Sequence, residues 1–375
     1  MVRLRTALEI TFIPPHRPIP ASDSGFSSGM GSGFGGRSFS DDFRRSRRAR
    51  YAPFVQPLRI ALAQIAPRLG LLDENLARHH EIIDEARGKG AGLVVFPELG
   101  LTGYLLQDLA AEVAMRLDDP RLATLASAAK GMSVIVSFVE ESGDHRLFIA
   151  AALLEEGRIA HVHRKLYLPT YGLFDERRFF AAGDLLRAVP SRLGVGVGLA
   201  VCEDFWHLDV PQILALDGAQ ILVNVSSSPG RDLAATNEVG LGTATSWRNL
   251  MRTYAQLTTS FVIFCNRVGV DESISFWGGS EVIAPSGEAV FSAPFFEEGL
   301  FTADISLADV RRERIGLPLL RDERPELHVR ELARIVAERA GLASDSTADD
   351  LAEAGLDVAP GDPIENPIGF RAGPR

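Results

Sequence analysis

Three polar side chains of this sequence have the types and positions that nucleophilic catalysis needs, and the first is Cys202. It ends the apolar part of RLGVGVGLAVCEDFW, where small and apolar residues alternate from Val195 to Val201. A thiol that attacks a carbonyl or nitrile carbon needs a base for its proton and a fixed donor for the charge on the substrate. A core cysteine is the other interpretation, and it is the one we favour for Cys265 in FVIFCN.

Two earlier stretches offer the base and the donor. Glu98 follows a short apolar run and Pro97 in GLVVFPELGLTGY, and Lys165 follows an alternating segment in HVHRKLYLPTYGLFDERRFF. Lys165 is one of only three lysines among 39 basic residues, so this chain uses lysine here although it uses arginine almost everywhere else. A compact ammonium fits between a carboxylate and a thiolate more easily than a planar guanidinium does. A solvated surface lysine is the alternative.

Each of these residues is expected to follow its own buried strand, as a site built across one edge of a sheet requires. The folded part begins near Pro57, and strands and helices mix throughout, which indicates an α/β or α+β protein. The predicted strands are 58–64, 93–96, 133–139, 147–154, 158–163, 195–201, 221–226 and 261–266, with strand-rich segments at 280–293 and 299–305. The predicted helices are 75–87, 121–130, 210–216, 242–258, 307–316 and 325–341.

In order and spacing, VVFPELGLTGY, HRKLYLPTYGLFDERRFF and VCEDFW resemble the signature stretches of the nitrilase (carbon-nitrogen hydrolase) superfamily, with its Glu-Lys-Cys triad. The resemblance covers residues 57–305 and is strongest to the glutaminase domains of glutamine-dependent NAD synthetases. It implies a four-layer α-β-β-α sandwich, usually assembled into homo-oligomers (dimers or larger). It also implies that Glu98, Lys165 and Cys202 are catalytic. No metal and no cofactor is expected.

The same resemblance suggests five further site residues. Glu176 matches a second carboxylate that would hold the lysine or relay a proton, although a surface salt-bridge cluster with its charged neighbours is an alternative. Tyr171 matches a substrate-lining aromatic residue, unless it is a core or rim tyrosine. Ser226 and Ser228 lie in NVSSSPG, which resembles an Asn-x-Ser-x-Ser-Pro loop beside the substrate. Glu203, next to the nucleophile, is expected to meet a polar group of the substrate such as an α-amino group.

These residues predict hydrolysis of a small linear amide, such as glutamine or another ω-amide, through a thioester and with release of ammonia. The Ser-Gly-Gly-x-Asp-Ser phosphate-binding loop of the synthetases does not occur in this sequence. We therefore expect a free-standing hydrolase or a glutaminase subunit that serves a separate ammonia-using NAD synthetase. A nitrilase that attacks a C≡N group with the same triad is the nearest rival. A non-enzymatic scaffold is disfavoured because all three triad members are present.

Composition limits the partners. The first 50 residues hold nine arginines against four acidic residues, whereas the remainder holds 30 basic and 45 acidic residues. Contact of the basic arm with the phosphates of nucleic acid or of a membrane is an alternative, but we favour an arm without a function of its own. An acidic body argues against nucleic acid as the main partner. No apolar run approaches the roughly 18 residues that a membrane span needs, so no membrane partner is expected. Two cysteines do not make a disulfide scaffold, and a thiol nucleophile favours the cytoplasm.

The sequence predicts four regions. A disordered Gly/Ser/Arg-rich arm covers 1–52, the hydrolase domain 57–305, a C-terminal helical extension 306–342, and an acidic Pro-rich tail 343–375. The glycines of GVGVG do not make a dinucleotide loop, because the third glycine of that motif is missing and the segment continues as a strand. His161 and His163 share one strand face, but no matching ligand spacing accompanies them, so we interpret them as solvated or core histidines.

Overall fold

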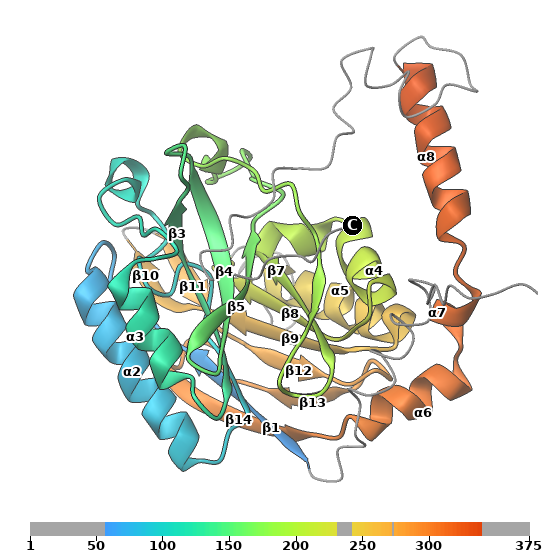
Figure 1. The fold of residues 1–375 in the computed structure, drawn as a ribbon, viewed down its shortest axis with the longest axis horizontal. Helices are drawn as coiled ribbons and strands as arrows, with labels where there is room; N and C mark the ends of the chain where they lie inside the picture. Colours follow the sequence, from blue (N-terminus) through green and yellow to red (C-terminus); the bar gives the residue numbers. More distant parts are fainter. Residues whose placement is uncertain (1–56, 231–241, 272–273, 340–375) are drawn as a thin grey trace, which may run out of the picture. The chain divides into compact units, whose positions relative to one another are not determined.

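A computed structural model describes residues 57–230, 242–271 and 274–339 (Figure 1). The predicted arm 1–52 and tail 343–375 lie outside these residues. The described part is built on two six-stranded sheets and a two-stranded ribbon. The ribbon pairs β10 (Val268–Asp271) with β11 (Ile274–Trp277) in antiparallel fashion.

The first sheet carries the segments of Glu98 and Lys165. In spatial order its strands are β14 (Gly299–Ile305), β1 (Leu58–Gln64), β2 (Leu93–Val95), β3 (Ser133–Glu141), β4 (Leu147–Glu155) and β5 (Arg158–Arg164). Strands β2 and β3 are parallel, and β4 is antiparallel to both β3 and β5. Strand β5 therefore runs in the same direction as β2. Because the carboxyl ends of such strands meet at one edge, Glu98 and Lys165 emerge on the same side of the sheet.

The second sheet carries the segment of Cys202. Its strands in spatial order are β13 (Ala289–Ser292), β12 (Glu281–Ile283), β9 (Phe261–Asn266), β8 (Ala219–Ser226), β7 (Gly196–Val201) and β6 (Ala188–Pro190). Strands β7, β8 and β9 are parallel. Cys202 directly follows β7, and the serines of NVSSSPG follow or end β8. The nucleophile and these serines are thus delivered to one edge by neighbouring strands.

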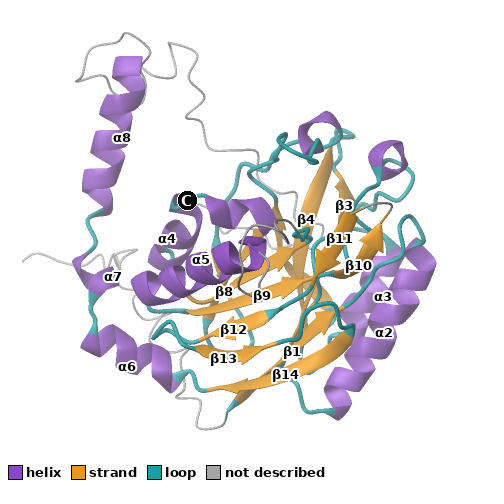
Figure 2. Ribbon diagram, turned by 180° about the vertical axis from the view of Figure 1, so that it is seen from behind, coloured by secondary structure: helices purple, strands orange, loops and turns teal. Residues whose placement is uncertain are grey.

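Helices cover both sheets on their outer faces (Figures 1 and 2). On β1, Ile60 and Leu62 belong to the core cluster that includes residues of both sheets, whereas Ala61 and Ala63 belong to the cluster that includes the helices of the first sheet. This alternation is the two-residue period of a strand buried on both faces. The covering helices are α2 (Leu72–Gly88) and α3 (Pro120–Ala128) for the first sheet, and α4 (Asp209–Leu216) and α5 (Gly242–Thr258) for the second. The predicted four-layer α-β-β-α sandwich is confirmed.

The predicted elements agree with the structure to within a few residues. Helix α5 has the predicted bounds, and α2 begins three residues before the predicted 75–87. The segment 280–293 forms the β12–β13 hairpin around Gly287, whose φ of 85° is the left-handed conformation that glycine adopts freely. The sequence analysis missed β6, β10 and β11. These strands have only three or four residues, too few to show a clear alternation.

Helices follow β14, the edge strand of the first sheet. The helices are α6 (Ala308–Gly316), α7 (Leu319–Asp322) and α8 (Pro325–Arg339). Within the described ranges, no helix is both long enough and apolar enough to cross a membrane.

Candidate active site

Cys202 lies in a backbone conformation that few residues other than glycine adopt. Its φ is 44°, and it opens a short 3-10 turn, η3 (Cys202–Trp206), at the end of β7. Such a conformation costs about 1–3 kcal/mol and is often found where a site needs a side chain held in a particular place. The hydroxyl of Ser226 donates to Cys202 Sγ at 3.2 Å. The thiol is therefore presented by a sharp turn rather than packed inside the sheet like Cys265.

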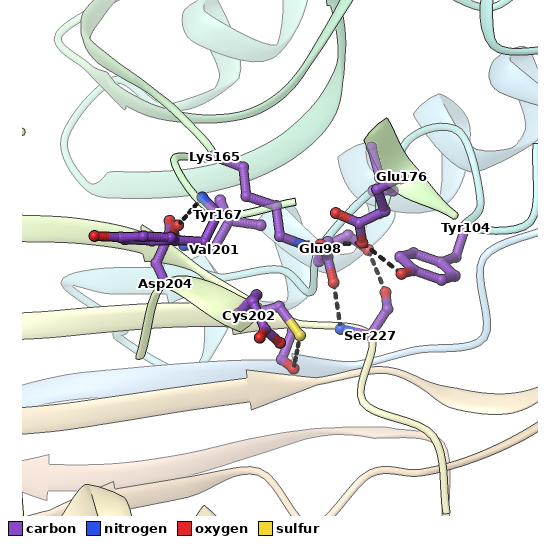
Figure 3. A network of polar contacts seen from close by, with 12 residues as sticks. Glu98, Tyr104, Lys165, Tyr167, Glu176, Val201, Cys202, Asp204 and Ser227 are labelled. Carbon is purple, nitrogen blue, oxygen red and sulfur yellow. Dashed lines mark hydrogen bonds and ion pairs between the residues drawn. The ribbon is translucent and has the colours of Figure 1, made fainter. Parts of the chain in front are cut away.

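Lys165 is the centre of a buried charged cluster (Figure 3). Its Nζ donates to Glu98 Oε1 and to Glu176 Oε1, both at 2.8 Å. Only 1% of Lys165 is exposed, so the alternative of a solvated surface lysine is excluded. Glu176 is likewise 5% exposed and does not belong to the surface pair that its neighbours Asp175 and Arg178 make at 3.9 Å.

The second oxygen of Glu98 is also held. The backbone N–H of Ser227 donates to Glu98 Oε2 at 2.8 Å, and the Ser227 hydroxyl donates to the Glu98 carbonyl at 2.9 Å. Ser227 follows β8 of the second sheet, whereas Glu98 follows β2 of the first. The carboxylate is thus fixed between the two sheets, with the ammonium on one oxygen and a main-chain donor on the other.

Tyr104 completes the cluster. Its hydroxyl donates to Glu176 Oε1 at 2.5 Å, and its ring makes edge contacts with Phe174 and Phe276. Glu176 Oε2 is buried and has no hydrogen-bond partner in the described structure. Tyr104, Phe174 and Glu176 also line a cavity of about 200 Å³ between the segments 104–108 and 173–180. Glu176 is therefore the member of the charged cluster that faces this cavity, whereas Glu98, Lys165 and Cys202 do not line it.

Burial determines the resting state of the thiol. It raises the pKa of Cys202 well above its ordinary value, and the Glu98 carboxylate raises it further, against the opposing effects of Lys165 and Ser226. At neutral pH the sulfur therefore keeps its proton, and attack requires a base at the moment of reaction. A base buried beside the thiol can take its proton as the sulfur attacks, so no preformed thiolate is needed.

The lysine and its second carboxylate respond to burial in opposite ways. Burial lowers the pKa of Lys165, but the attraction of Glu176, Glu98 and Cys202 outweighs it, so the net pKa is raised well above its ordinary value. Burial raises the pKa of Glu176 to about 7, since the repulsion by Glu98 adds to it and the attraction by Lys165 only partly compensates. The ammonium therefore stays charged, while Glu176 changes its protonation near neutral pH.

The residues predicted to bind substrate form two separate groups. Tyr171 lies at the surface, 53% exposed, and its hydroxyl donates to both oxygens of Glu203 at 2.9 and 3.0 Å. Ser226 bonds the nucleophile, whereas the Ser228 hydroxyl is buried and accepts the indole N–H of Trp247 at 2.8 Å and of Trp277 at 3.4 Å. The substrate-binding role of these four residues stays a prediction.

The sequence analysis did not assign Tyr104, Ser227 or Asp204 to the site. All three stand inside the motifs named above: Tyr104 in LTGY, Ser227 in NVSSSPG and Asp204 in CEDFW. Asp204 pairs with the buried His163 at 2.8 Å. His163 is thus engaged by a carboxylate rather than arranged with His161. Across the described ranges, no three His, Cys, Asp or Glu side chains form a group that could hold a metal ion.

Known proteins match both the sequence and the fold. Residues 59–314 match the family model described as Carbon-nitrogen hydrolase. The glutamine-dependent NAD(+) synthetase of Thermotoga maritima is 35% identical over 259 residues, which are 68% of this chain and 43% of that protein. The chain spans about half the length of the curated synthetases that it matches.

Two solved structures share the fold. A carbon-nitrogen hydrolase from Helicobacter pylori G27 superposes with a TM-score of 0.65 and 27% identity, over 74% of this chain and 99% of that one. An amidase from Nesterenkonia sp. AN1 superposes with a TM-score of 0.61 and 25% identity, over 74% and 97%. In that amidase structure, the acetamide moiety of fluoroacetamide is covalently added at the active site cysteine.

Proposed function

This chain belongs to the carbon-nitrogen hydrolase family, and from that premise we propose that it hydrolyses a small linear amide through a thioester on Cys202, with release of ammonia. The observation that carries the proposal is the buried Lys165: its Nζ lies 2.8 Å from Glu98 Oε1, and the charges of both groups act on the pKa of the Cys202 thiol. Base, cationic donor and thiol are the three groups that acyl transfer needs.

In the first half-reaction, Glu98 takes the proton of the Cys202 thiol and the sulfur attacks the amide carbon. The Lys165 ammonium and the backbone N–H of Glu203, the residue after the nucleophile, stabilise the negative oxygen of the tetrahedral intermediate. The carbon–nitrogen bond then breaks, and Glu98 returns the proton to the leaving nitrogen. Ammonia departs and an acyl group remains on the sulfur.

In the second half-reaction, the same carboxylate takes a proton from water, which attacks the thioester carbon. The carbon–sulfur bond breaks, the carboxylic acid leaves, and the proton returns to Cys202. Glu176 supports both steps by holding the ammonium of Lys165 in place, and the Tyr104 hydroxyl fixes the orientation of Glu176. A raised Glu176 pKa also suits this residue to relay a proton.

For the substrate we propose glutamine or another ω-amide. Glu203 directly follows Cys202 in the chain, and the hydroxyl of Tyr171 donates to its carboxylate. A carboxylate at this position suits a cationic α-amino group of the substrate. Similarity to glutamine-dependent NAD(+) synthetases supports this choice and a role as the glutaminase part that feeds a separate ammonia-using synthetase. Homo-oligomers, dimers or larger, are the proposed assembly of the hydrolase domain at 57–305.

Ammonia release from a panel of substrates tests the proposal. The panel contains glutamine, other ω-amides, propionamide, and an aliphatic and an aromatic nitrile, each with the wild type and with Cys202→Ala. We expect ammonia from the amides with the wild type alone, and the highest kcat/KM for glutamine or a close ω-amide. Preferred turnover of a nitrile would instead identify a nitrilase. No turnover of any member would support a non-enzymatic role.

A further inference from the structure

The carboxylate of Asp204 binds the backbone that follows Lys165. Its Oδ1 accepts the N–H of Leu166 at 2.9 Å and the N–H of Tyr167 at 3.1 Å (Figure 3). Asp204 is fully buried, and its bond partners lie about 40 positions earlier in the chain. The main chain of Lys165 is itself bonded to Ile149 and Gly183, both at 2.8 Å. The two residues after it lie beyond β5, and there the carboxylate of Asp204 accepts both main-chain N–H groups.

The other oxygen of Asp204 binds the backbone that precedes the nucleophile. Oδ2 accepts the N–H of Val201 at 2.9 Å and a bond from His163 Nε2 at 2.8 Å. Val201 is the residue before Cys202, and His163 is on β5, two residues before the lysine. The side chain of Asp204 is therefore bonded to residues before and after Lys165 and to the residue directly before Cys202.

These bonds connect the two sheets. His163 belongs to β5 of the first sheet, whereas Val201 ends β7 of the second. No ladder joins those two strands, since they belong to separate sheets. The relative placement of the two segments therefore depends on side-chain packing and on the carboxylate of Asp204, and the hydrogen bonds are the directional part of that connection.

The chemistry of the four bonds requires an ionised carboxylate and a particular tautomer of the histidine. An ionised carboxylate accepts about four hydrogen bonds and donates none. The four donors around Asp204 fill this capacity, and His163 must therefore carry its proton on Nε2. An asparagine at 204 would keep the volume but would turn an N–H group toward the donors of Val201 and His163.

We propose that His163 and Asp204 are a pair of positioning residues, which set the Lys165 ammonium at its working distance from the Cys202 sulfur. The inference rests on the proposed roles of that lysine and that cysteine. Acyl transfer depends steeply on such placement, because a shift of about 1 Å can lower a rate about 100-fold. The pair touches no substrate atom and acts through the two catalytic segments.

His161 provides a matched control. It lies two residues before His163 on the same strand, and its buried Nε2 has no hydrogen-bond partner in the described structure. Burial lowers the pKa of His161 to about 4, so its ring is neutral at pH 7. Replacement of this imidazole by leucine removes a half-buried ring from the same strand without removing any of the bonds to Asp204.

The test compares four variants with the wild type: His163→Leu, His163→Gln, Asp204→Asn and His161→Leu. The kcat and KM are measured with the best amide of the panel, and the alkylation rate of Cys202 is measured with iodoacetamide. In alkylation the sulfur displaces iodide from carbon, so no oxyanion donor is needed. Lys165 also lowers the pKa of the thiol, so its displacement slows alkylation to some extent, but only turnover loses the oxyanion donor as well. A positioning role therefore lowers turnover more than alkylation, whereas general loss of structure lowers both alike.

We expect His163→Leu and Asp204→Asn to lower kcat about 10- to 100-fold, with KM close to the wild-type value and a clearly smaller fall of the alkylation rate. His163→Gln, whose amide can donate in place of Nε2–H, should recover most of the loss, and His161→Leu should match the wild type. If the leucine variant does not fold, the glutamine and asparagine variants decide, because both conserve polarity and approximate volume.

Two outcomes would overturn the inference: wild-type kcat in both His163→Leu and Asp204→Asn, or a parallel fall of kcat and alkylation that His163→Gln does not restore. Failure of the proposed function looks different. In that case the wild type itself would not be alkylated at Cys202, or Cys202→Ala would still hydrolyse the amide.

Discussion

Lys165 Nζ lies 2.8 Å from Glu98 Oε1, although 67 residues separate the two in the chain. Both side chains are fully buried, and the carboxylate is held from its other side by the main chain of Ser227. Breaking a buried ion pair by removal of one partner leaves an uncompensated charge and costs about 3–5 kcal/mol. The geometry of this ion pair is therefore fixed before any substrate arrives.

If a compact ammonium is required, Lys165→Arg should fold and lose most of its turnover. Loss of one oxyanion donor costs about 2.7–4 kcal/mol, or about 100- to 1000-fold in kcat. The guanidinium keeps the charge but cannot bring one nitrogen to both carboxylates in the same space. Lys130→Arg, at an exposed position after α3, is the matched control and should keep wild-type kcat. A Lys165→Arg enzyme as active as this control would show that the lysine is peripheral.

Glu98→Gln should lower kcat about 100- to 10,000-fold, because an amide cannot take the proton of a thiol whose pKa is raised by burial. Steady-state ammonia release measures the effect, with Glu112→Gln, an exposed carboxylate, as the control. Circular dichroism verifies that the variant folds. Retention of more than a tenth of the activity would assign the base to another group.

Glu176 should make stability depend on pH. Its folded pKa of about 7 exceeds the ordinary 4.5, so the folded protein binds more protons than the unfolded chain between these values. Stability from this group is therefore greatest at low pH and is lost as the pH rises through 7. Urea unfolding of the wild type and of Glu176→Gln measures this contribution. The free energy of unfolding of the wild type, relative to that of the variant, should be larger at pH 5 than at pH 8 by about 2–3 kcal/mol. An equal difference at both pH values would contradict the assignment.

Glu203→Gln and Tyr171→Phe should weaken the preference for glutamine over propionamide. A hydrogen bond to a charged group is worth about 1.5–3 kcal/mol, which corresponds to about 10- to 100-fold in the kcat/KM ratio for Glu203→Gln. Tyr171→Phe should have a smaller effect, since it frees the carboxylate without removing it. Tyr167→Phe, which loses a hydroxyl bonded to Asp209, is the control. An unchanged ratio in both variants would exclude this pair from substrate recognition.

The sequence predicted those parts of the molecule whose signal is local. Strand β7 alternates, α5 shows helical periodicity, and each candidate catalytic residue follows a strand, so the sandwich and the grouping of Glu98, Lys165 and Cys202 could be expected. The contacts that hold these three residues in place could not be predicted from the sequence. Tyr104 meets Glu176 across 72 positions, between the segments that follow β2 and β5 of the first sheet, whereas Asp204 meets His163 across 41 positions, between the two sheets. Only the tertiary fold brings such pairs together.

The different contacts of Ser226 and Ser228 could not be predicted from the sequence either. Ser226 and Ser228 belong to one short motif, and the motif alone suggests a common role. In the structure one hydroxyl bonds the nucleophile, whereas the other is enclosed by Trp247 and Trp277. The direction of each side chain at the end of β8 depends on the turn geometry, which the residue types do not specify.

The central claim is that Cys202 forms the covalent intermediate, and intact-mass spectrometry after reaction with an electrophilic amide analogue tests it most directly. The matched control is Cys265→Ala: that thiol is fully buried, its Sγ contacts the Ala63 and Val95 carbonyls, and burial raises its pKa. We expect one adduct on the wild type and on Cys265→Ala, and none on Cys202→Ala. An adduct that persists in Cys202→Ala, or that disappears in Cys265→Ala, would contradict it.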